Sequence, residues 1–193
     1  MLPRKLEIRI ENTILKESST GSESLLGCHI DGSLKWNSQV RLLVGKLIKR
    51  LNYLLSLQKV CSFSMRKALA EGLFNSVMIY CLPLFGGLNK NMRNQIQTVQ
   101  NRAARFVCDA PPRSNRSALF RKIGWMTVDQ LIQYHTLISV FKIRCAKQPE
   151  YLAGFLCTDS RNHRIMMRHR INLTLFQDSF CVRGANQWNK LPY

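Results

Sequence analysis

Acidic residues are scarce in this sequence of 193 residues: 11 Asp and Glu stand against 29 Lys and Arg, for a net charge of +18. The longest apolar run, Leu73 to Phe85, is interrupted by Asn75, Ser76 and Pro83. It falls short of the ~20 apolar residues that a membrane helix needs, so we expect no membrane partner. The first residues contain no apolar core of signal-peptide length, which predicts residence inside the cell, in the nucleus or the cytoplasm.

Cysteine motifs that would mark a disulfide framework or a zinc finger are also missing. The seven cysteines are an odd number and include no C-x-x-C pair, so we expect reduced, mostly buried thiols. Cys157, His163, His169 and Cys181 are separated by five, five and eleven residues, which matches no compact finger. No local signature pairs a cysteine with a histidine for nucleophilic catalysis. We therefore expect no metal, no cofactor and no small-molecule substrate.

Positive charge is what the sequence has in excess, and it is concentrated in the middle. Residues 32–148 contain nineteen Lys and Arg but only Glu71, Asp109 and Asp129 as acids, whereas residues 1–31 are nearly neutral. Charge at this density repels itself in a compact fold, and the usual compensation is a phosphate backbone that releases its counterions on binding. The charge pattern therefore predicts contact with nucleic acid; a merely soluble basic protein is the alternative.

The hydrophobic period changes along the chain from that of a strand to that of a helix. Leu6, Ile8 and Ile10 alternate with charged residues and residues 24–31 are a second extended stretch, so we expect two short strands joined by residues 16–22. From Asn37, which is placed to cap the start, the period is helical, with one apolar and one basic face. The apolar face holds Val40, Leu43, Val44, Leu47, Ile48, Leu51, Leu54 and Leu55.

Further helical patterns follow in the basic middle of the chain. A helix after Ser62, weakened by Gly72, includes Met65, Leu69, Leu73 and Tyr80. A helix over about residues 88–108 has one apolar side made of Leu88, Met92, Ile96, Val99, Ala103 and Phe106. Residues 117–123 form a short helix that ends at Gly124, and Thr127 caps a last helix through Leu131, Tyr134, Ile138 and Phe141.

The last part of the chain shows no lasting period, and the basic stretch 161–170 is expected to be a loop. The sequence thus predicts a mainly α fold, in which a small helical bundle is preceded by a short β-hairpin and followed by an irregular C-terminal tail. The expected divisions are a hairpin over residues 1–35, a basic bundle over 36–148 and a partly irregular extension over 149–193.

Five short sequence motifs follow one another along the chain. They are Leu25-Leu-Gly-Cys-His-Ile-Asp-Gly-Ser-Leu-Lys-Trp36, Val99-Gln-Asn-Arg-Ala-Ala-Arg105, Leu119-Phe-Arg-Lys-Ile-Gly-Trp125, Val140-Phe-Lys-Ile143 with Pro149-Glu-Tyr-Leu152, and Phe180-Cys-Val-Arg-Gly-Ala-Asn-Gln-Trp-Asn-Lys-Leu-Pro192. In this order they resemble segments of the reverse transcriptases of non-LTR (LINE-type, Jockey-like) retrotransposons. By this resemblance the chain corresponds to the C-terminal part of such an enzyme: the end of the palm, the helical thumb and the tail.

A thumb implies contact with the template–primer duplex. Its cations meet phosphates and sugars without reading bases, so the resemblance predicts non-specific binding of RNA or of an RNA/DNA duplex. The candidate contact residues are the cations of the first and third helices, namely Arg41, Lys46, Lys49, Arg50, Lys90, Arg93, Arg102 and Arg105. Trp36, Trp125 and Trp188 could stack on bases, but each adjoins an apolar helix end, so we expect them in the core.

The paired aspartates that hold two metal ions in a templated polymerase are absent. All the aspartates of the chain are isolated, with no D-D and no D-x-D. We therefore expect no catalytic residue and no enzyme activity, as in a truncated, inactive remnant. Two alternatives stay open: a piece of an active polymerase whose palm lies upstream, and a domesticated helical module that binds protein.

Overall fold

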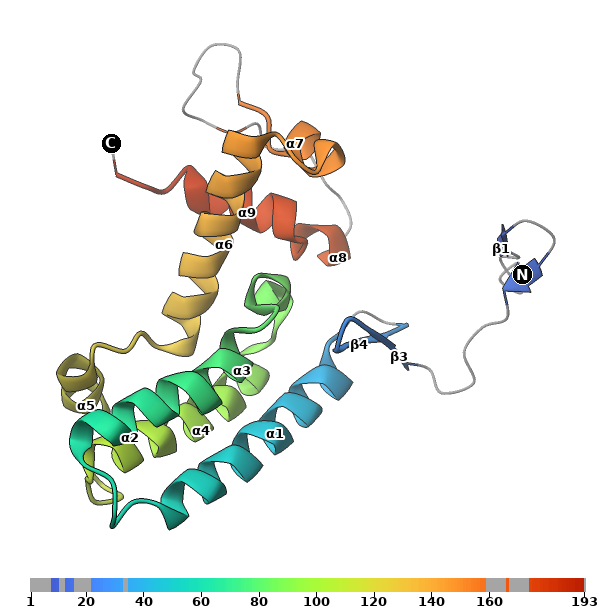
Figure 1. Cartoon of the computed structure of the whole chain (residues 1–193). Helices are drawn as coiled ribbons and strands as arrows, with labels where there is room; N and C mark the ends of the chain where they lie inside the picture. The colour runs from blue at the N-terminus through green and yellow to red at the C-terminus, as the bar shows by residue number, and fades with distance from the viewer. Residues whose placement is uncertain are drawn as a thin grey trace.

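The computed structural model describes residues 8–10, 13–15, 22–32, 35–158, 166 and 174–192. These residues form a mainly α-helical protein with short β-hairpins at its N-terminal end (Figure 1), which confirms the predicted fold class. Two clusters of buried side chains hold the helices together, a large one within residues 36–132 and a smaller one that includes Val140, Leu156 and Ala185. No helix of the described ranges has the length and apolar character that crossing a bilayer requires.

The strands form two hairpins. β1 (Ile8–Ile10) pairs antiparallel with β2 (Thr13–Leu15), and β3 (Ser22–Leu25) pairs antiparallel with β4 (Cys28–Asp31). The sequence predicted one hairpin connected by residues 16–22, whereas the structure has a hairpin on either side of that segment. Each strand pairs with its nearest neighbour in sequence, because closing a short loop costs less entropy than closing a long one.

The helix α1 (Asn37–Ser56) presents its predicted apolar face to the large cluster. The predicted cap is wrong: Asn37 is the first helical residue, and the helix begins after Trp36 without a side-chain cap. Trp36 adopts a left-handed backbone, with φ of 63°, and its ring packs edge-on against Phe85 at 5.6 Å between centroids. The helix start is thus positioned by an aromatic contact in the core.

The second helical segment changes its winding halfway. α2 (Phe63–Leu69) runs into a π-helical turn, η1 (Ala70–Asn75), and then into α3 (Ser76–Ile79). The wider turn, which contains Gly72, shifts the buried face to Ala70, Phe74 and Met78. Among the apolar residues that the sequence placed in this helix, Met65, Leu73 and Tyr80 are exposed.

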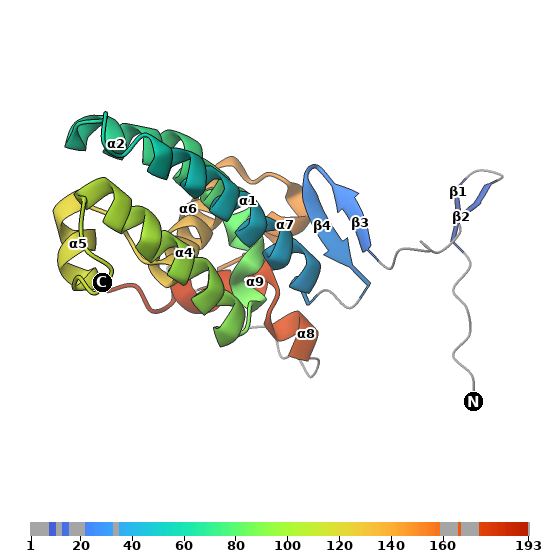
Figure 2. The same cartoon turned by 90° about the horizontal axis from the view of Figure 1, so that it is seen from below.

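The basic third helix lies next to α1. After the 3₁₀ segment η2 (Leu82–Gly87), Asn89 caps α4 (Lys90–Cys108) by accepting a hydrogen bond from the Met92 backbone at 2.9 Å. The apolar side predicted for this helix is buried, from Leu88 to Phe106. Figure 2 shows α1 and α4 side by side.

Two further helices follow α4 in the chain. α5 (Arg116–Ile123) ends at Gly124, and α6 (Val128–Ala146) starts with the predicted Thr127 cap, which forms a capping box with Gln130. The predicted apolar stripe of α6 is not the face that packs in the core. The helix is apolar on more than one side, and contacts with other helices decide which side is buried. The core receives Val128, Ile132, Thr136, Val140 and Ile143, while Tyr134 and Phe141 are exposed.

The C-terminal part contains helices where the sequence showed no period. α7 (Glu150–Phe155), α8 (Thr174–Gln177) and α9 (Phe180–Trp188) lie beyond the bundle, and α9 packs on α6 (Figure 1). Arg183 of α9 donates a hydrogen bond to the Pro83 carbonyl at 2.9 Å and so connects this part to η2. Of the predicted loop 161–170, only Met166 lies within the described residues; it is buried.

Candidate nucleic-acid interface

Two hollows lie between α1 and α4, one at each end of the helix pair, and residues of both helices line each hollow. The hollow near the two helix starts has a volume of about 200 Å³ and is lined by Asn37, Val40, Arg41, Asn89, Asn91, Met92 and Gln95. The hollow near the C-terminal ends of the two helices has a volume of about 270 Å³ and is lined by Leu55, Gln58, Arg102, Arg105, Phe106, Ala110 and Pro112. Because the start of α1 lies beside the start of α4 and the end of α1 beside the end of α4, the two helices run parallel. We call the two hollows and the surface between them the α1–α4 groove.

Three of the predicted contact residues flank the α1–α4 groove. Arg41 stands at one end, and Arg102 and Arg105 stand at the other. Within the described residues the structure gives none of these three guanidinium groups an ion pair or a hydrogen bond, and Arg41 and Arg102 are exposed. Their charge is therefore available to an anion outside the protein.

Each of the three acids of the basic stretch accepts a contact from another side chain of the protein. Asp109 accepts a hydrogen bond from the Gln58 amide at 2.5 Å, and Asp129 lies 3.3 Å from the Arg93 guanidinium. Glu71 accepts a hydrogen bond from the indole nitrogen of a core tryptophan at 3.1 Å. Among the described residues, no Asp or Glu lines either end of the groove, although Asp109 lies beside one end through its bond to Gln58. The charged residues of the lining itself are arginines.

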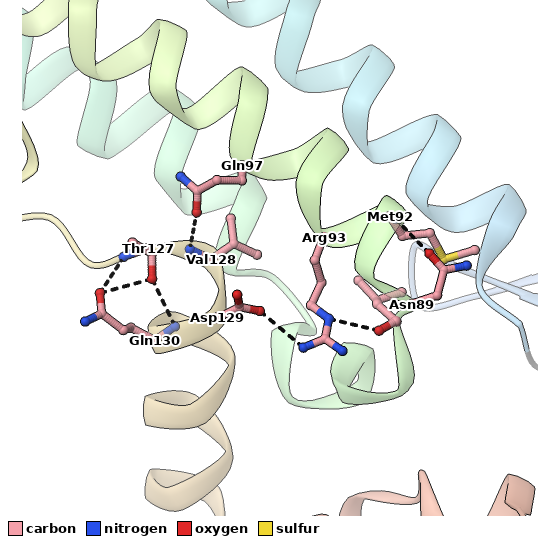
Figure 3. Close-up of polar contacts among 9 residues, drawn as sticks. Asn89, Met92, Arg93, Gln97, Thr127, Val128, Asp129 and Gln130 are labelled. Atoms are coloured by element: carbon pink, nitrogen blue, oxygen red, sulfur yellow. Dashed lines mark hydrogen bonds and ion pairs between the residues drawn. The ribbon is translucent and has the colours of Figure 1, made fainter. Parts of the chain in front are cut away.

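Arg93 has a structural position that the sequence did not reveal (Figure 3). Its Nε donates to the Leu88 carbonyl at 2.9 Å, and its Nη1 lies 3.3 Å from Asp129 at the start of α6. The side chain thus connects the start of α4 with the start of α6. Although Arg93 belonged to the predicted contact set, its guanidinium is engaged within the protein.

The remaining predicted residues lie on other faces. Lys46 and Arg50 line a second pocket between α1, α3 and the β3–β4 turn. Lys49 is exposed on α1, and Lys90 is exposed at the first position of α4. The eight cations therefore do not form one surface: some flank the α1–α4 groove, and Lys46 and Arg50 lie together elsewhere.

The tryptophans pack as predicted. Trp36 and Trp125 lie against the large cluster, and Trp188 lies against the smaller one. The guanidinium carbon of Arg144 also lies 4.8 Å from the ring centroid of Trp188. These rings are thus used within the protein.

The cysteines are free thiols, as predicted, although only Cys28 is fully buried and Cys145 is exposed. Burial, with the neighbouring Cys81 thiol, raises the pKa of Cys28 to about 12. Burial also raises the pKa of Cys108 and of Cys181. These three thiols are protonated near neutral pH, so they are not activated nucleophiles.

No close group of three or more potential metal ligands occurs in the described parts of the chain. Of the four Cys and His residues considered as zinc ligands, His163 and His169 lie outside the described residues.

Comparison with known proteins gives a relative among transposon enzymes. The chain is 26% identical over 137 residues to the probable RNA-directed DNA polymerase from transposon BS of Drosophila melanogaster. The match covers 69% of this chain but only 15% of that protein. No protein-family model matches the chain, and no solved structure matches it. The similarity supports a relation to reverse transcriptases.

This similarity contradicts the prediction that the chain is not an enzyme. The relative is named as a polymerase, which is an enzyme. The prediction treated the absence of paired aspartates as a property of a whole protein, whereas the match spans 15% of the relative's length. The missing pair is therefore a property of this stretch and does not decide whether the protein is active.

Proposed function

We propose that the chain forms the thumb-like part of a non-LTR retrotransposon reverse transcriptase, from the end of its palm to the C-terminal tail. In this proposal the α1–α4 groove holds the template–primer duplex. The observation that carries it is the placement of Arg41, Arg102 and Arg105 along one groove that, among the described residues, no acid lines. The match to a transposon polymerase supports the same assignment.

The size of the groove suits a nucleic-acid backbone. The part of α4 between Asn91 and Arg102 is about 16 Å long at a rise of 1.5 Å per residue. That length corresponds to about five base-pair steps along the axis of a duplex, at about 3.4 Å a step. The arginines at the two ends would therefore meet different phosphates, which gives affinity without base recognition.

Gly45 of α1 also supports the proposal that a nucleic-acid backbone lies in the groove. It lies one helical turn after Arg41, and a β-carbon added there would meet no atom within 4 Å. A glycine inside a helix costs roughly 0.5–1 kcal/mol relative to alanine, and here no packing contact requires it. Close approach of a ligand backbone to α1 would use the space that the missing side chain leaves.

The test is a charge reversal at both ends of the groove, Arg41→Glu with Arg102→Glu. We expect the affinity for an RNA/DNA hybrid to fall at least tenfold in a fluorescence anisotropy titration. The slope of log K against log salt should also decrease by about one for each phosphate that the variant no longer neutralises.

The matched control is Arg121→Glu with Lys142→Glu, which makes the same change in charge at exposed positions of α5 and α6. This pair should weaken binding much less, because it changes only the overall charge. If the two double variants bound the RNA/DNA hybrid with equal affinity, the groove would not be part of the binding interface.

A further inference from the structure

The second pocket lies where the hairpin that directly precedes the bundle meets two helices. The turn between β3 and β4, residues 39–50 of α1, and α3 with the residue after it enclose a volume of about 440 Å³, within the range of small-ligand sites. Its lining residues are Leu26, Gly27, Gln39, Leu42, Leu43, Lys46, Arg50, Ser76, Val77 and Tyr80. None of them is needed by the α1–α4 groove.

The pocket is on a different side of α1 from that groove. With about 100° of rotation per residue, Lys46 lies about 140° and Arg50 about 180° around the helix from Arg41. A ligand in this pocket and a duplex in the groove would therefore contact opposite flanks of α1, and binding at the two places can be separated by mutation.

The polar wall of the pocket consists of hydrogen-bond donors. Lys46 and Arg50 are its charged members among the described residues, and no acid lines it. Arg50 is oriented by donating from Nη1 to the Leu73 carbonyl at 2.6 Å, which leaves its other N–H groups free to bind. Lys46 forms no ion pair or hydrogen bond with the described residues. These groups favour an anion.

Gln39 supplies a further donor. Its side chain is only 6% exposed, and its Oε1 accepts a hydrogen bond from the His29 backbone at 2.8 Å. Because the Gln39 oxygen must face the His29 N–H, the orientation of the amide group is determined. Its Nε2 group has no hydrogen-bond partner within the described part of the chain. A side-chain donor without a protein partner, beside two cations in one pocket, is placed to bind a phosphate oxygen.

Other lining residues of the pocket are apolar or aromatic. Leu42, Leu43 and Val77 line it, and the ring of Tyr80 is half exposed, at 52%. The Tyr80 hydroxyl donates to the Leu26 carbonyl at 2.6 Å, which holds the ring beneath the β3–β4 turn. A flat aromatic ring beside aliphatic side chains is a surface on which a nucleobase stacks.

We propose that this pocket binds one unpaired nucleotide of a single-stranded nucleic acid. The phosphate meets Lys46, Arg50 and the Gln39 amide, and the base lies on Tyr80. The proposal adds a single-strand site to the chain and does not depend on duplex binding in the α1–α4 groove.

The test follows the side-chain amide of Gln39 by ¹⁵N-correlated NMR while adenosine monophosphate, and then a single-stranded oligoadenylate, is added to the chain. We expect saturable shifts of the Gln39 amide with both probes. Lys46→Glu should weaken the affinity for the monophosphate about tenfold, since it removes a charge-assisted contact. Lys49→Glu, the same change three residues later and outside the pocket lining, should alter it less than about twofold.

Other results would overturn the proposal. Inorganic phosphate that shifts the amide as strongly as the nucleotide would show a simple anion site. Tighter binding of an acidic, apolar peptide would show a protein site, and unshifted Gln39 at saturating oligoadenylate would exclude the pocket. Lys46→Gln, which keeps the side-chain stem, gives the same comparison should Lys46→Glu unfold. The affinity of Lys46→Gln for a duplex is measured in parallel. It shows whether the pocket proposal fails alone or together with the proposal that the α1–α4 groove binds a duplex.

Discussion

Single arginine side chains perform two different tasks in this protein. Arg66 donates from Nε to the Val107 carbonyl at 3.2 Å and from Nη1 to the Cys61 carbonyl at 3.0 Å. It thus connects α2 to α4 and to the loop before α2. Arg183 does the same between α9 and η2, and its burial lowers the pKa of its guanidinium. Arg41 and Arg102 have no such partner within the described residues. Arginines of this second kind have all their N–H groups available for a ligand.

The contact of Arg183 with η2 requires a glycine. A β-carbon on Gly86 would overlap the guanidinium of Arg183, so Gly86→Ala must displace this group from the Pro83 carbonyl. We expect Gly86→Ala to lower the free energy of unfolding by about 2 kcal/mol, the cost of losing a charge-assisted hydrogen bond in a partly buried place. Urea unfolding measures this change.

A double-mutant cycle gives the control for that prediction. Once Arg183→Ala has removed the guanidinium, Gly86→Ala should cost less than about 0.5 kcal/mol, because nothing then occupies the space. A similar cost of Gly86→Ala in both backgrounds would mean that the alanine acts through the η2 backbone.

At the scale of helices, a chain of amides sets the direction of α6 relative to α4. Gln97 accepts a hydrogen bond from the Val128 backbone at 2.9 Å (Figure 3). Gln100 donates to the Met126 carbonyl at 2.9 Å and accepts from Gln97 at 2.9 Å. Both glutamines belong to α4, and both backbone partners lie at the turn into α6. These bonds fix where α6 leaves the bundle.

Replacing the buried member of this chain should destabilise the helix junction. Gln100 is 1% exposed, so Gln100→Leu would keep most of the volume but leave the Met126 carbonyl without its partner. We expect a loss of about 1–3 kcal/mol in the free energy of unfolding. Urea unfolding followed by circular dichroism gives the measurement.

Gln95→Leu is the matched substitution, because Gln95 is exposed on the same helix. Its effect should stay within about 0.5 kcal/mol. Equal effects of the two substitutions would show that the amide contacts of Gln100 contribute nothing beyond helix propensity.

For the molecule as a whole, the net charge of +18 opposes folding and favours anionic partners. Salt should therefore have opposite effects on the two processes. Raising NaCl from about 20 mM to about 200 mM shortens the Debye length and weakens the self-repulsion, so we expect the midpoint of thermal unfolding to rise by a few degrees. Affinity for a duplex should fall steeply over the same range.

Calorimetric scans of the free chain test the first effect, with potassium chloride as a comparison at the same ionic strength. Since screening depends on ionic strength, the two salts should act alike at these concentrations. A midpoint that stays constant or falls would mean that the charges are already compensated within the fold.

By itself, the sequence determined the helical class, the apolar sides of α1 and α4, the end of α5 at Gly124 and the cap of α6. These features are local: each depends on residues within a few turns, so periodicity and capping residues are enough to find them. The sequence likewise shows the excess of cations in residues 32–148, and this excess predicts an anionic partner.

Only the tertiary structure decided which of those cations face outward together. Arg93 and Arg102 are alike in the sequence, yet one contacts Asp129 and the other lies in a groove with Arg105. The same holds for α6, where Tyr134 belongs to an apolar stripe but is exposed. A charge becomes a binding group, and an apolar face becomes a core, through contacts between segments distant in sequence, which local periodicity does not encode.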